Sequence, residues 1–322
     1  MTRIFAYIQH KGGVVDDSAA ELAAAARKID AAAPVTAIVT GSGTELDAVC
    51  DSLCASYSEV LKVRSDPLAY PNAEIVRKAL LSVLPVGGII LVPHNTFGMD
   101  LSPGLSIKMD SAFVSDVVDI EGIQGSALKL VRQEYGGQFS THVICDISSG
   151  AVLNIRPGSF QVEETMVTNG VVIDHVIDAG ILTAGRRYLE TIAAEMGDVD
   201  ITKADVLVSI GRGIQEQKNV DIARELADAM GAVVSCSRPI VDAKWMDKSR
   251  QVGTTGQTVK PKVYMACGIS GSFQHLGGIK GNPFIVAINK NPNAPIFQTA
   301  DVGVVADILE LLPELTNRIR EM

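Results

Sequence analysis

Short apolar runs alternate with amphipathic segments along the first hundred residues of the chain. The apolar runs predict strands at residues 4–8, 35–39, 60–63 and 88–92, and the segments between them predict helices at 19–29, 45–53 and 73–84. A strand buried on both faces is apolar throughout, and strands that alternate with helices are typical of a parallel sheet covered by helices. The pattern therefore predicts an N-terminal α/β domain with a parallel sheet.

The pattern changes after residue 112, where apolar runs follow one another without helical segments between them. These runs predict strands at residues 113–120, 127–132, 142–145 and 152–155. Strands joined directly favour antiparallel pairing, so we expect an antiparallel extension of the same domain. Residues 156–200 carry no firm pattern, and we interpret them as one or two strands followed by a linker. The first domain is thus expected to span residues 1–195.

Strand and helix signals alternate again in residues 196–322, which we expect to form a doubly wound C-terminal α/β domain. Asn219 and Gly231 are residue types that begin and end a helix. The segment 236–262 is long for a loop in such a domain, and loops of that length are often functional. The predicted strands are 206–210, 232–235, 263–267 and 284–288, and the predicted helices are 220–230 and 304–321, the latter amphipathic and broken near Pro313.

A loop rich in glycine and serine follows the strand predicted at residues 263–267. Gly268 ends the apolar run, and Ser270, Gly271 and Ser272 precede a helical turn that starts at Phe273. In a parallel sheet, a strand, loop and helix start of this kind direct backbone N–H groups toward an anion at the carboxyl edge. The pattern alone therefore favours an anionic or nucleotide ligand.

Two glycine motifs favour simpler interpretations. Gly41 and Gly43 follow a strand as in a dinucleotide-binding fingerprint, but Leu46 stands where the third glycine belongs, so we interpret them as a helix-entry turn. Residues 268–272 resemble a hydrolase nucleophile elbow, but Ser272 replaces its closing glycine and the nearest base, His275, has no assignable acid. No catalytic acid–base pair can be assigned from the spacing.

Composition narrows the class of protein. A chain of 322 residues with 47% apolar and 20% charged residues can form two globular domains. A net charge of −9 argues against a nucleic-acid partner, and the apolar runs are too short to span a bilayer, so we expect no stable membrane insertion. The first strand starts without a preceding leader pattern, which favours a cytoplasmic protein.

The five cysteines are scattered along the sequence. Cys50 and Cys54 lie four residues apart on a predicted helix, but no histidine or third cysteine lies near them in sequence. We interpret all five as small thiols rather than as metal ligands, and we expect no metal site. An electron-transfer role would therefore need an organic cofactor.

The run CGISGSFQHLGGIKG, followed by IVAINKNPNAPIFQTADVGVVADILELLPEL, closely resembles the C-terminal domain of the electron-transfer flavoprotein alpha subunit. The resemblance is dense over residues 206–322, including SIGRGIQEQKNVDIARELADAMGAVVSCSRPIVDAKWMDKSRQVGTTGQTVKPKVY. It is thinner in the first half, where HNTFGMDLSPGLSIKMDSAFVSDVVDI and NIRPGSF carry it. In this family the C-terminal domain holds FAD.

The resemblance implies which residues tune the flavin. Arg238 is implied to lie over the isoalloxazine ring, the Thr255 hydroxyl to reach flavin N5, and His275 to lie beside the C2 carbonyl. Asn289 is implied to bond the ribityl or phosphate region. The implied cofactor-binding residues are Arg212, Ser237, Arg238, Gln251, Val252, Gly253, Thr254, Thr255, Gly268, Ile269, Ser270, Gly271, Ser272, Phe273, Gln274, His275, Asn289 and, at the adenosine end, Asp307 and Ile308.

One of these positions departs from the family pattern. Thr254 stands where many members carry glutamine, and this changes only the contact made by that side chain. The segment from Ser270 to His275 is implied to supply backbone donors to the cofactor.

The function that the resemblance implies is electron carriage. A primary flavoprotein dehydrogenase, as in fatty acid β-oxidation, reduces the FAD, and the protein passes electrons on one at a time through the flavin semiquinone. The alpha subunit forms a heterodimer with a beta subunit that binds AMP, or a second FAD in members that bifurcate electrons from NADH. Two alternatives stay open: a subunit of an electron-bifurcating NADH-dependent acyl-CoA reductase complex, and a nucleotide-binding structural or regulatory module without a redox role.

Overall fold

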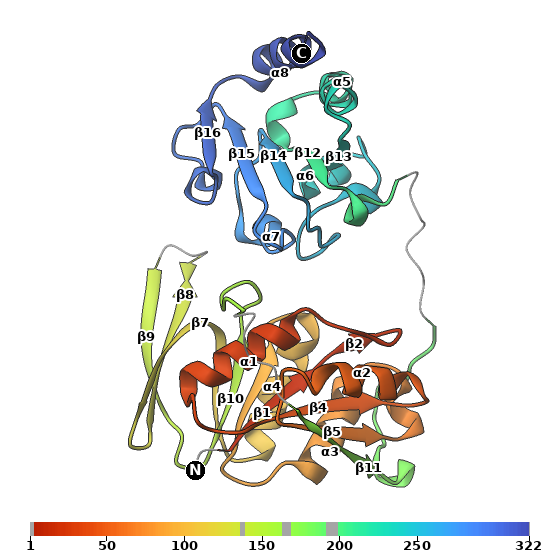
Figure 1. The fold of residues 1–322 in the computed structure, drawn as a ribbon, viewed down its shortest axis with the longest axis vertical. Coiled ribbons are helices and arrows are strands. Elements are labelled where there is room, and N and C mark those ends of the chain that lie inside the picture. The colour runs from red at the N-terminus through yellow and green to blue at the C-terminus, as the bar shows by residue number, and fades with distance from the viewer. Residues whose placement is uncertain (1–2, 136–138, 163–168, 191–198, 322) are drawn as a thin grey trace. The chain divides into compact units, whose positions relative to one another are not determined.

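A computed structural model describes residues 3–135, 139–162, 169–190 and 199–321 (Figure 1). The chain divides into two compact units, Met1–Glu190 and Thr191–Met322. The domain boundary expected after residue 195 falls within 191–198 and lies outside the described residues. Each unit has its own parallel sheet and its own apolar core.

The first unit is built on a nine-stranded sheet with the order β11-β5-β4-β1-β6-β10-β7-β8-β9. All neighbours from β11 to β7 are parallel. Ala6, Val39 and Leu91 are fully buried at the centre of this region, as expected for strands covered on both faces. The parallel strands are β1 (Ile4–Ile8), β4 (Val35–Gly41), β5 (Glu59–Arg64), β6 (Ile89–Pro93), β10 (Ala151–Ile155) and β11 (Val171–Val176).

Helices cover both faces of this sheet (Figure 1). The helices α1 (Ser18–Ile29) and α2 (Glu45–Leu53) pack in the core on one face. The helices α3 (Ala73–Val83) and α4 (Thr96–Lys108) pack in the core on the other face. The predicted α/β domain with a parallel sheet is therefore confirmed.

The antiparallel extension is present, but one strand was wrongly assigned to it. The strands β7 (Ala112–Gln124), β8 (Ala127–Glu134) and β9 (Phe139–Asp146) pair antiparallel. The run predicted at residues 152–155 is β10, which inserts between β6 and β7 and is parallel to both. All five residues of β10 are buried, and a continuous apolar run of this kind belongs to a parallel strand rather than to a half-exposed antiparallel one.

The segment 156–200, for which we expected one or two strands and a linker, contains β11, an edge strand beside β5 whose side chains are mostly exposed. Other short elements were not predicted. The strands β2 (His10–Lys11) and β3 (Val14–Val15) form a small hairpin. Short 3-10 turns occupy Asp66–Ala69 and Ala179–Ile181 here, and Ile201–Lys203, Arg212–Ile214, Gln217–Asn219, Lys248–Arg250 and Pro295–Gln298 in the second unit.

The second unit contains a five-stranded sheet in which all neighbours are parallel, with the order β13-β12-β14-β15-β16. The strand order turns back on itself between β12 and β14, which makes this a doubly wound sheet, as predicted. The helices α5 (Val220–Met230) and α8 (Ile308–Arg320) share one core, and α6 (Arg238–Asp242) and α7 (Phe273–Leu276) are single turns. The strands are β12 (Val206–Ile210), β13 (Val233–Cys236), β14 (Val263–Cys267), β15 (Phe284–Asn289) and β16 (Val302–Val305).

The helix predicted over residues 304–321 is wrong at both its start and its break. Its first residues belong to β16, which pairs with β15, and α8 begins only after Asp307, whose side chain accepts the N–H of Leu309. Pro313 lies inside α8 without ending it. Leu312 and Thr316 on the buried face are almost fully covered, and this packing offsets the hydrogen bond that proline removes.

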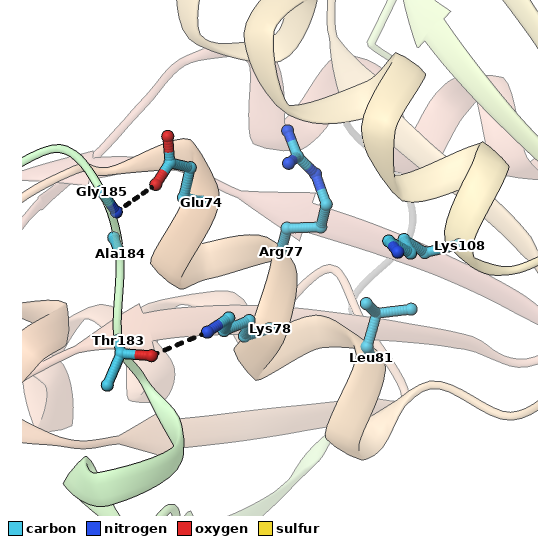
Figure 2. A pocket seen from close by; sticks show the side chains of 8 residues that line it. All are labelled: Glu74, Arg77, Lys78, Leu81, Lys108, Thr183, Ala184 and Gly185. Atoms are coloured by element: carbon cyan, nitrogen blue, oxygen red, sulfur yellow. Dashed lines mark hydrogen bonds between the residues drawn. The ribbon is translucent and has the colours of Figure 1, made fainter.

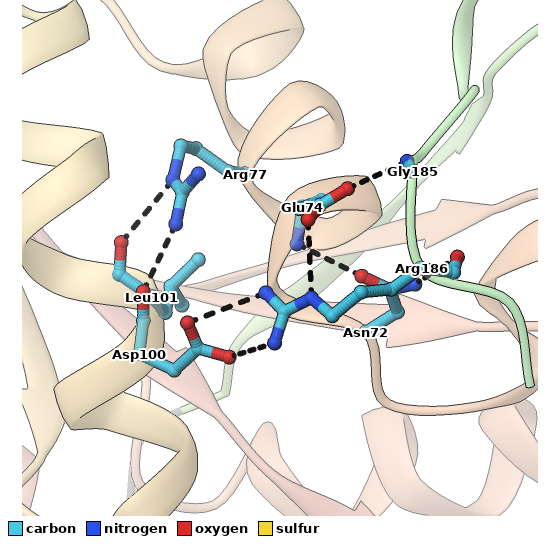
Figure 3. Close-up of polar contacts among 7 residues, drawn as sticks. All are labelled: Asn72, Glu74, Arg77, Asp100, Leu101, Gly185 and Arg186. Carbon is cyan, nitrogen blue, oxygen red and sulfur yellow. Dashed lines mark hydrogen bonds and ion pairs between the residues drawn. The ribbon is translucent and has the colours of Figure 1, made fainter.

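Ion pairs and hydrogen bonds connect the segment at Gly185 and Arg186 to the helices α3 and α4 (Figure 3). Arg186 pairs with Glu74 at 3.1 Å and with Asp100 at 2.7 Å, and the Gly185 N–H donates to Glu74 at 2.8 Å. Arg77 donates to the backbone carbonyls of Asp100 and Leu101. These exposed contacts add little stability individually, but together they fix the path of the chain beside the two helices.

Candidate functional site

A cavity of about 420 Å³ opens at the carboxyl ends of the strands of the second sheet. Gly211, Ser237 and Gly268, which follow β12, β13 and β14, line it together with Asn289, the last residue of β15. In open α/β sheets, ligands bind outside the carboxyl ends of the strands where the strand order reverses, here between β12 and β14. The full lining is Gly211, Arg212, Gly213, Ser237, Arg238, Pro239, Asp242, Gln251, Val252, Gly253, Thr255, Gly268, Ile269, Ser270, Ser272, Gln274, His275 and Asn289.

Glycines bring two of the strand-end loops into direct backbone contact. The Gly213 N–H donates to the Gly268 carbonyl at 3.1 Å, and Gly268 has a φ of +66°. A Cβ on Gly211 would meet the Gly268 carbonyl oxygen at 2.4 Å, and one on Gly213 would meet the Gly268 Cα at 2.6 Å. Only glycine fits at these two positions, so the floor of the cavity is backbone rather than side chain.

The long loop after β13 folds against α7 on another side of the cavity. The Gln251 side chain is buried, and its Nε2 donates to Thr255 Oγ1 at 3.0 Å. The Thr254 N–H donates to the Gln274 carbonyl at 2.8 Å. A Cβ on Gly278 would meet the Gly253 nitrogen at 2.3 Å, so the two segments also pack at backbone distance. Residues of this loop therefore form part of the cavity wall, and its functional role stays a prediction.

His275 contributes an unusual polar group to the cavity wall. The residue is 5% exposed, and its Nε2 lies 2.8 Å from the hydroxyl of the buried Tyr264. Burial lowers the pKa of His275 to about 4, and the nearby Val252 carbonyl opposes this shift only in part. Nδ1 is buried and makes no hydrogen bond of normal geometry with a described residue. At neutral pH the ring is therefore a neutral hydrogen-bonding group and not a cation.

Positive charge at the cavity comes from arginines instead. Arg238 is the first residue of α6, and its side chain is 67% exposed and pairs with Asp242 at 3.4 Å. Arg212 lines the cavity from the loop after β12. Asn289 has a structural task, since its Nδ2 donates to the Ile269 carbonyl at 2.8 Å and so shapes the loop after β14.

The structure brings most of the expected site residues together at this cavity, and five lie elsewhere. Asp307 caps α8 and pairs with Lys290 at 2.6 Å, while Ile308 is buried in the core between α5 and α8. Gly271 packs on the neighbouring backbone, where a Cβ would meet the Ile296 nitrogen at 2.3 Å. The expected residues outside the lining are Thr254, Gly271, Phe273, Asp307 and Ile308, and their contacts with a cofactor stay predictions.

Four lining residues, Gly211, Gly213, Pro239 and Asp242, are outside the expected set. Pro239 and Asp242 lie on α6 together with the expected Arg238. The available signal for Asp242 was its position four residues after Arg238, because residues at that spacing share a face of a helix. Gly211 and Gly213 flank the expected Arg212 in sequence.

A second cavity of about 360 Å³ lies in the first unit beside α3 and α4 (Figure 2). Arg77, Lys78 and Lys108 line it together with Glu74. Two of the cations are engaged, since Lys78 donates to Thr183 Oγ1 at 2.9 Å and Arg77 donates to carbonyls of α4. None of the expected site residues lies here.

Other kinds of site find little support in the described residues. Among these residues no group of three or more histidine, cysteine or acidic side chains is placed to hold a metal ion. In the part of the chain that the structure describes, no helix is both long and apolar enough to cross a membrane.

A doubly wound domain with a cavity at its switch point is typical of nucleotide-binding proteins. Residues 200–280 match the family model described as the electron transfer flavoprotein FAD-binding domain, and residues 4–195 match the electron transfer flavoprotein domain. The chain belongs to the electron transfer flavoprotein alpha subunit family, as its sequence predicted.

Three relatives illustrate the range of this family. Electron transfer flavoprotein subunit alpha of Methylophilus methylotrophus is 34% identical over 99% of both chains. The mitochondrial subunit alpha of Oryza sativa subsp. japonica is 34% identical over 97% of this chain and 88% of its own. Lactate dehydrogenase (NAD(+),ferredoxin) subunit LctC of Acetobacterium woodii is 30% identical over 98% of this chain and 76% of its own.

Proposed function

We propose that this chain is the FAD-binding alpha subunit of a heterodimeric electron-transfer flavoprotein. In this role it carries electrons between a primary flavoprotein dehydrogenase and a downstream acceptor. The cavity at the β12–β14 switch point carries the proposal, because most residues that the family resemblance implies at FAD line this one cavity. The match of residues 200–280 to a FAD-binding domain supports the same ligand.

The groups at the cavity fit FAD chemically. Arg212 and Arg238 supply the positive charge that a pyrophosphate and a reduced ring require, and a guanidinium can also stack on a flat ring. His275 lines the same cavity as a neutral polar residue. Bound FAD would supply a centre that takes up and releases single electrons. The chain's own residues would bind and orient it, and the folded loop 251–257 would exclude water.

The proposed partner is an electron-transfer flavoprotein beta subunit. Family membership supports this pairing, and the proposal extends to AMP, or a second FAD, bound in that subunit. Large apolar side chains on the first unit, including Tyr135, Phe139 and Ile144, are more than half exposed, which is consistent with a chain that meets another protein.

Flavin content tests the central proposal. The full chain, co-expressed with its beta subunit and purified, should show a flavin spectrum, and heat-released cofactor should be identified as FAD by chromatography. A preparation that retains no flavin after supplementation with FAD would contradict the proposal. A nucleotide other than a flavin at the cavity would favour the non-redox module instead.

A second candidate, a subunit of an electron-bifurcating NADH-dependent acyl-CoA reductase or related complex, is favoured by one observation. The relative from Acetobacterium woodii is named for NAD(+) and ferredoxin together. The nucleotide in the beta subunit separates the two functions. One FAD and one AMP per heterodimer would support the simple carrier, and two FAD would support the bifurcating complex.

A further inference from the structure

The cavity of about 360 Å³ in the first unit gathers three cationic side chains. Arg77 and Lys78 project from α3, and Lys108, the last residue of α4, extends from that helix toward α3 (Figure 2). The rest of the wall includes Glu74 and the segment 183–185. This concentration of positive charge contrasts with the net charge of −9 that the whole chain carries.

The carboxylates beside this cavity are already paired with another arginine. Arg186 pairs with Glu74 at 3.1 Å and with Asp100 at 2.7 Å, and Glu74 also accepts the Gly185 N–H (Figure 3). The Gly185 N–H and Arg186 lower the pKa of Glu74, and Arg186 lowers that of Asp100, so both carboxylates stay ionised and paired at neutral pH. Within the described part of the chain, none of the three cavity cations forms an ion pair.

The three cations also keep hydrogen-bond donors that the described residues do not take up. Arg77 donates to two backbone carbonyls of α4, from Nη2 at 2.9 Å and from Nε at 3.4 Å. Lys78 donates to Thr183 Oγ1 at 2.9 Å, and Lys108 makes no hydrogen bond with a described residue. A guanidinium has five N–H donors and an ammonium has three, so each of the three groups can still donate to a ligand.

Arg77 and Lys108 are held close together on α4. The Arg77 guanidinium lies against the α4 backbone at Gly104, where a Cβ would meet its Cζ at 2.4 Å. Lys108 follows Gly104 by four residues and therefore lies on the same face of the helix, about one turn further along. Like charges at this spacing repel each other, and an anion bound between them would remove that repulsion.

We propose that this cavity is a binding site for a compact small molecule that carries phosphate groups. Phosphate oxygens suit the donors present, because a guanidinium can bind them in a bidentate manner and an ammonium binds them as a point charge. None of the described lining residues is aromatic, and Leu81 is the one large apolar side chain among them, so the lining offers no surface on which a nucleobase could stack. The cavity belongs to the first unit, and the proposal does not depend on FAD binding in the second.

Inorganic pyrophosphate is the probe for this site. Titration calorimetry of the purified full chain, at about 0.15 M salt so that weak surface attraction is screened, should detect its binding. Lys108→Gln and Lys78→Gln should each weaken that binding about tenfold, since each removes a charge-assisted hydrogen bond. Both side chains are exposed, so the two variants should unfold at the same urea concentration as the wild type. Lys11→Gln, which removes an exposed lysine elsewhere in the first unit, is the matched control and should change the affinity less than twofold.

Hydrogen exchange of the same chain locates the bound probe. Pyrophosphate should slow exchange of the backbone amides at 183–185 in the wild type, and Lys108→Gln should reduce this protection. Equal losses of affinity in Lys108→Gln and Lys11→Gln would show that only the overall charge matters and would overturn the proposal. Loss of binding in Arg238→Ala with full binding in Lys108→Gln would place the probe in the second unit and would also overturn it. Citrate binding as tight as that of pyrophosphate would refute a preference for phosphate.

Discussion

At the scale of single residues, Arg238 is the cavity residue for which the proposed function makes the sharpest prediction. Its guanidinium is 67% exposed, and the nearby Asp242, at 3.4 Å, is 63% exposed. Solvent screens an ion pair of this kind, so the aspartate competes weakly with a ligand for the arginine. A positive charge beside a redox centre stabilises the reduced, more negative state.

Replacing Arg238 should therefore change the potential rather than the fold. We expect Arg238→Ala to lower the one-electron potential of bound FAD by tens of millivolts while FAD remains bound, since a tenfold effect equals about 59 mV. Arg238→Lys should recover part of the loss, because an ammonium lacks the planar stacking surface. Spectroelectrochemical titration measures the potentials of both variants.

Arg224→Ala is the control, because it removes another exposed, ion-paired arginine of the same unit, and its potential should match that of the wild type. Equal potentials in Arg238→Ala and the wild type would place Arg238 away from the flavin.

His275 should make the stability of the second unit depend on pH. Its pKa is depressed from 6.5 to about 4 on folding, so the unfolded state binds the proton more readily. The free energy of unfolding is therefore unaffected by this group above pH 6.5. It decreases by about 3 kcal/mol as the pH falls from 6.5 toward 4. Urea unfolding followed by the fluorescence of Trp245, the one tryptophan, should show this loss in the wild type and a flatter profile in His275→Gln. His142→Gln, which removes an exposed histidine, should keep the wild-type slope.

At the scale of elements, the loop between β14 and α7 depends on packing as much as on ligand binding. Gly271 has a φ of +84°, and a Cβ there would approach the Ile296 nitrogen to 2.3 Å. The Ile296 N–H also donates to the Ser270 carbonyl at 3.0 Å. A side chain at Gly271 would thus disturb the contact that holds this loop against the turn at Pro295–Gln298.

Gly271→Ala should consequently destabilise the second unit by more than its backbone angle alone requires. We expect about 3 kcal/mol or more, because both the left-handed conformation and the clash with backbone contribute. Gly231→Ala is the matched control: Gly231 ends α5 with a φ of +63° and nothing within 4 Å of its Cβ position, so its loss should be about 1 kcal/mol. Equal losses of unfolding free energy in the two variants, measured by urea unfolding, would show that the contact with Ile296 is unimportant.

The sequence predicted the elements of the second unit well where burial was complete. The strand at residues 263–267 was predicted with its observed bounds because it is an uninterrupted apolar run that ends at a glycine. The strand β16 was missed because Val302–Val305 is mostly exposed, and its valines extended the apparent periodicity of the next helix. Edge strands lose the burial pattern on which such predictions depend.

The candidate site was predictable from two sources. The pattern of the chain placed only the loop from Gly268 to Ser272 at the carboxyl edge of the sheet, and the other site residues, such as Ser237, came from the family resemblance. The hydrogen bond between Tyr264 and His275 could not be predicted, since it joins two elements whose distance is set only by packing. Asp307 suits both ribose binding and helix capping, and its local role as a cap is the one that the structure displays.

At the scale of the whole molecule, each unit carries a different part of the proposed function. The second unit holds the candidate FAD cavity, and the first unit matches the general electron transfer flavoprotein domain. The first unit has a second cavity but none of the expected cofactor residues, so its extensive sheet serves another purpose. Under the proposed function that purpose is assembly with the beta subunit.

The proposed function therefore predicts that this chain forms a heterodimer with the beta subunit. Co-expression with the beta subunit should give a stable one-to-one heterodimer that carries FAD. Exposed apolar residues such as Tyr135, Phe139 and Ile144 would stabilise it, because removing apolar surface from water is favourable. Light scattering should report a mass well above the 34.1 kDa of this chain, together with the flavin absorbance. The chain expressed alone should be poor in flavin or prone to association. A stable, flavin-loaded monomer at working concentration would contradict an obligate heterodimer while leaving the FAD cavity intact.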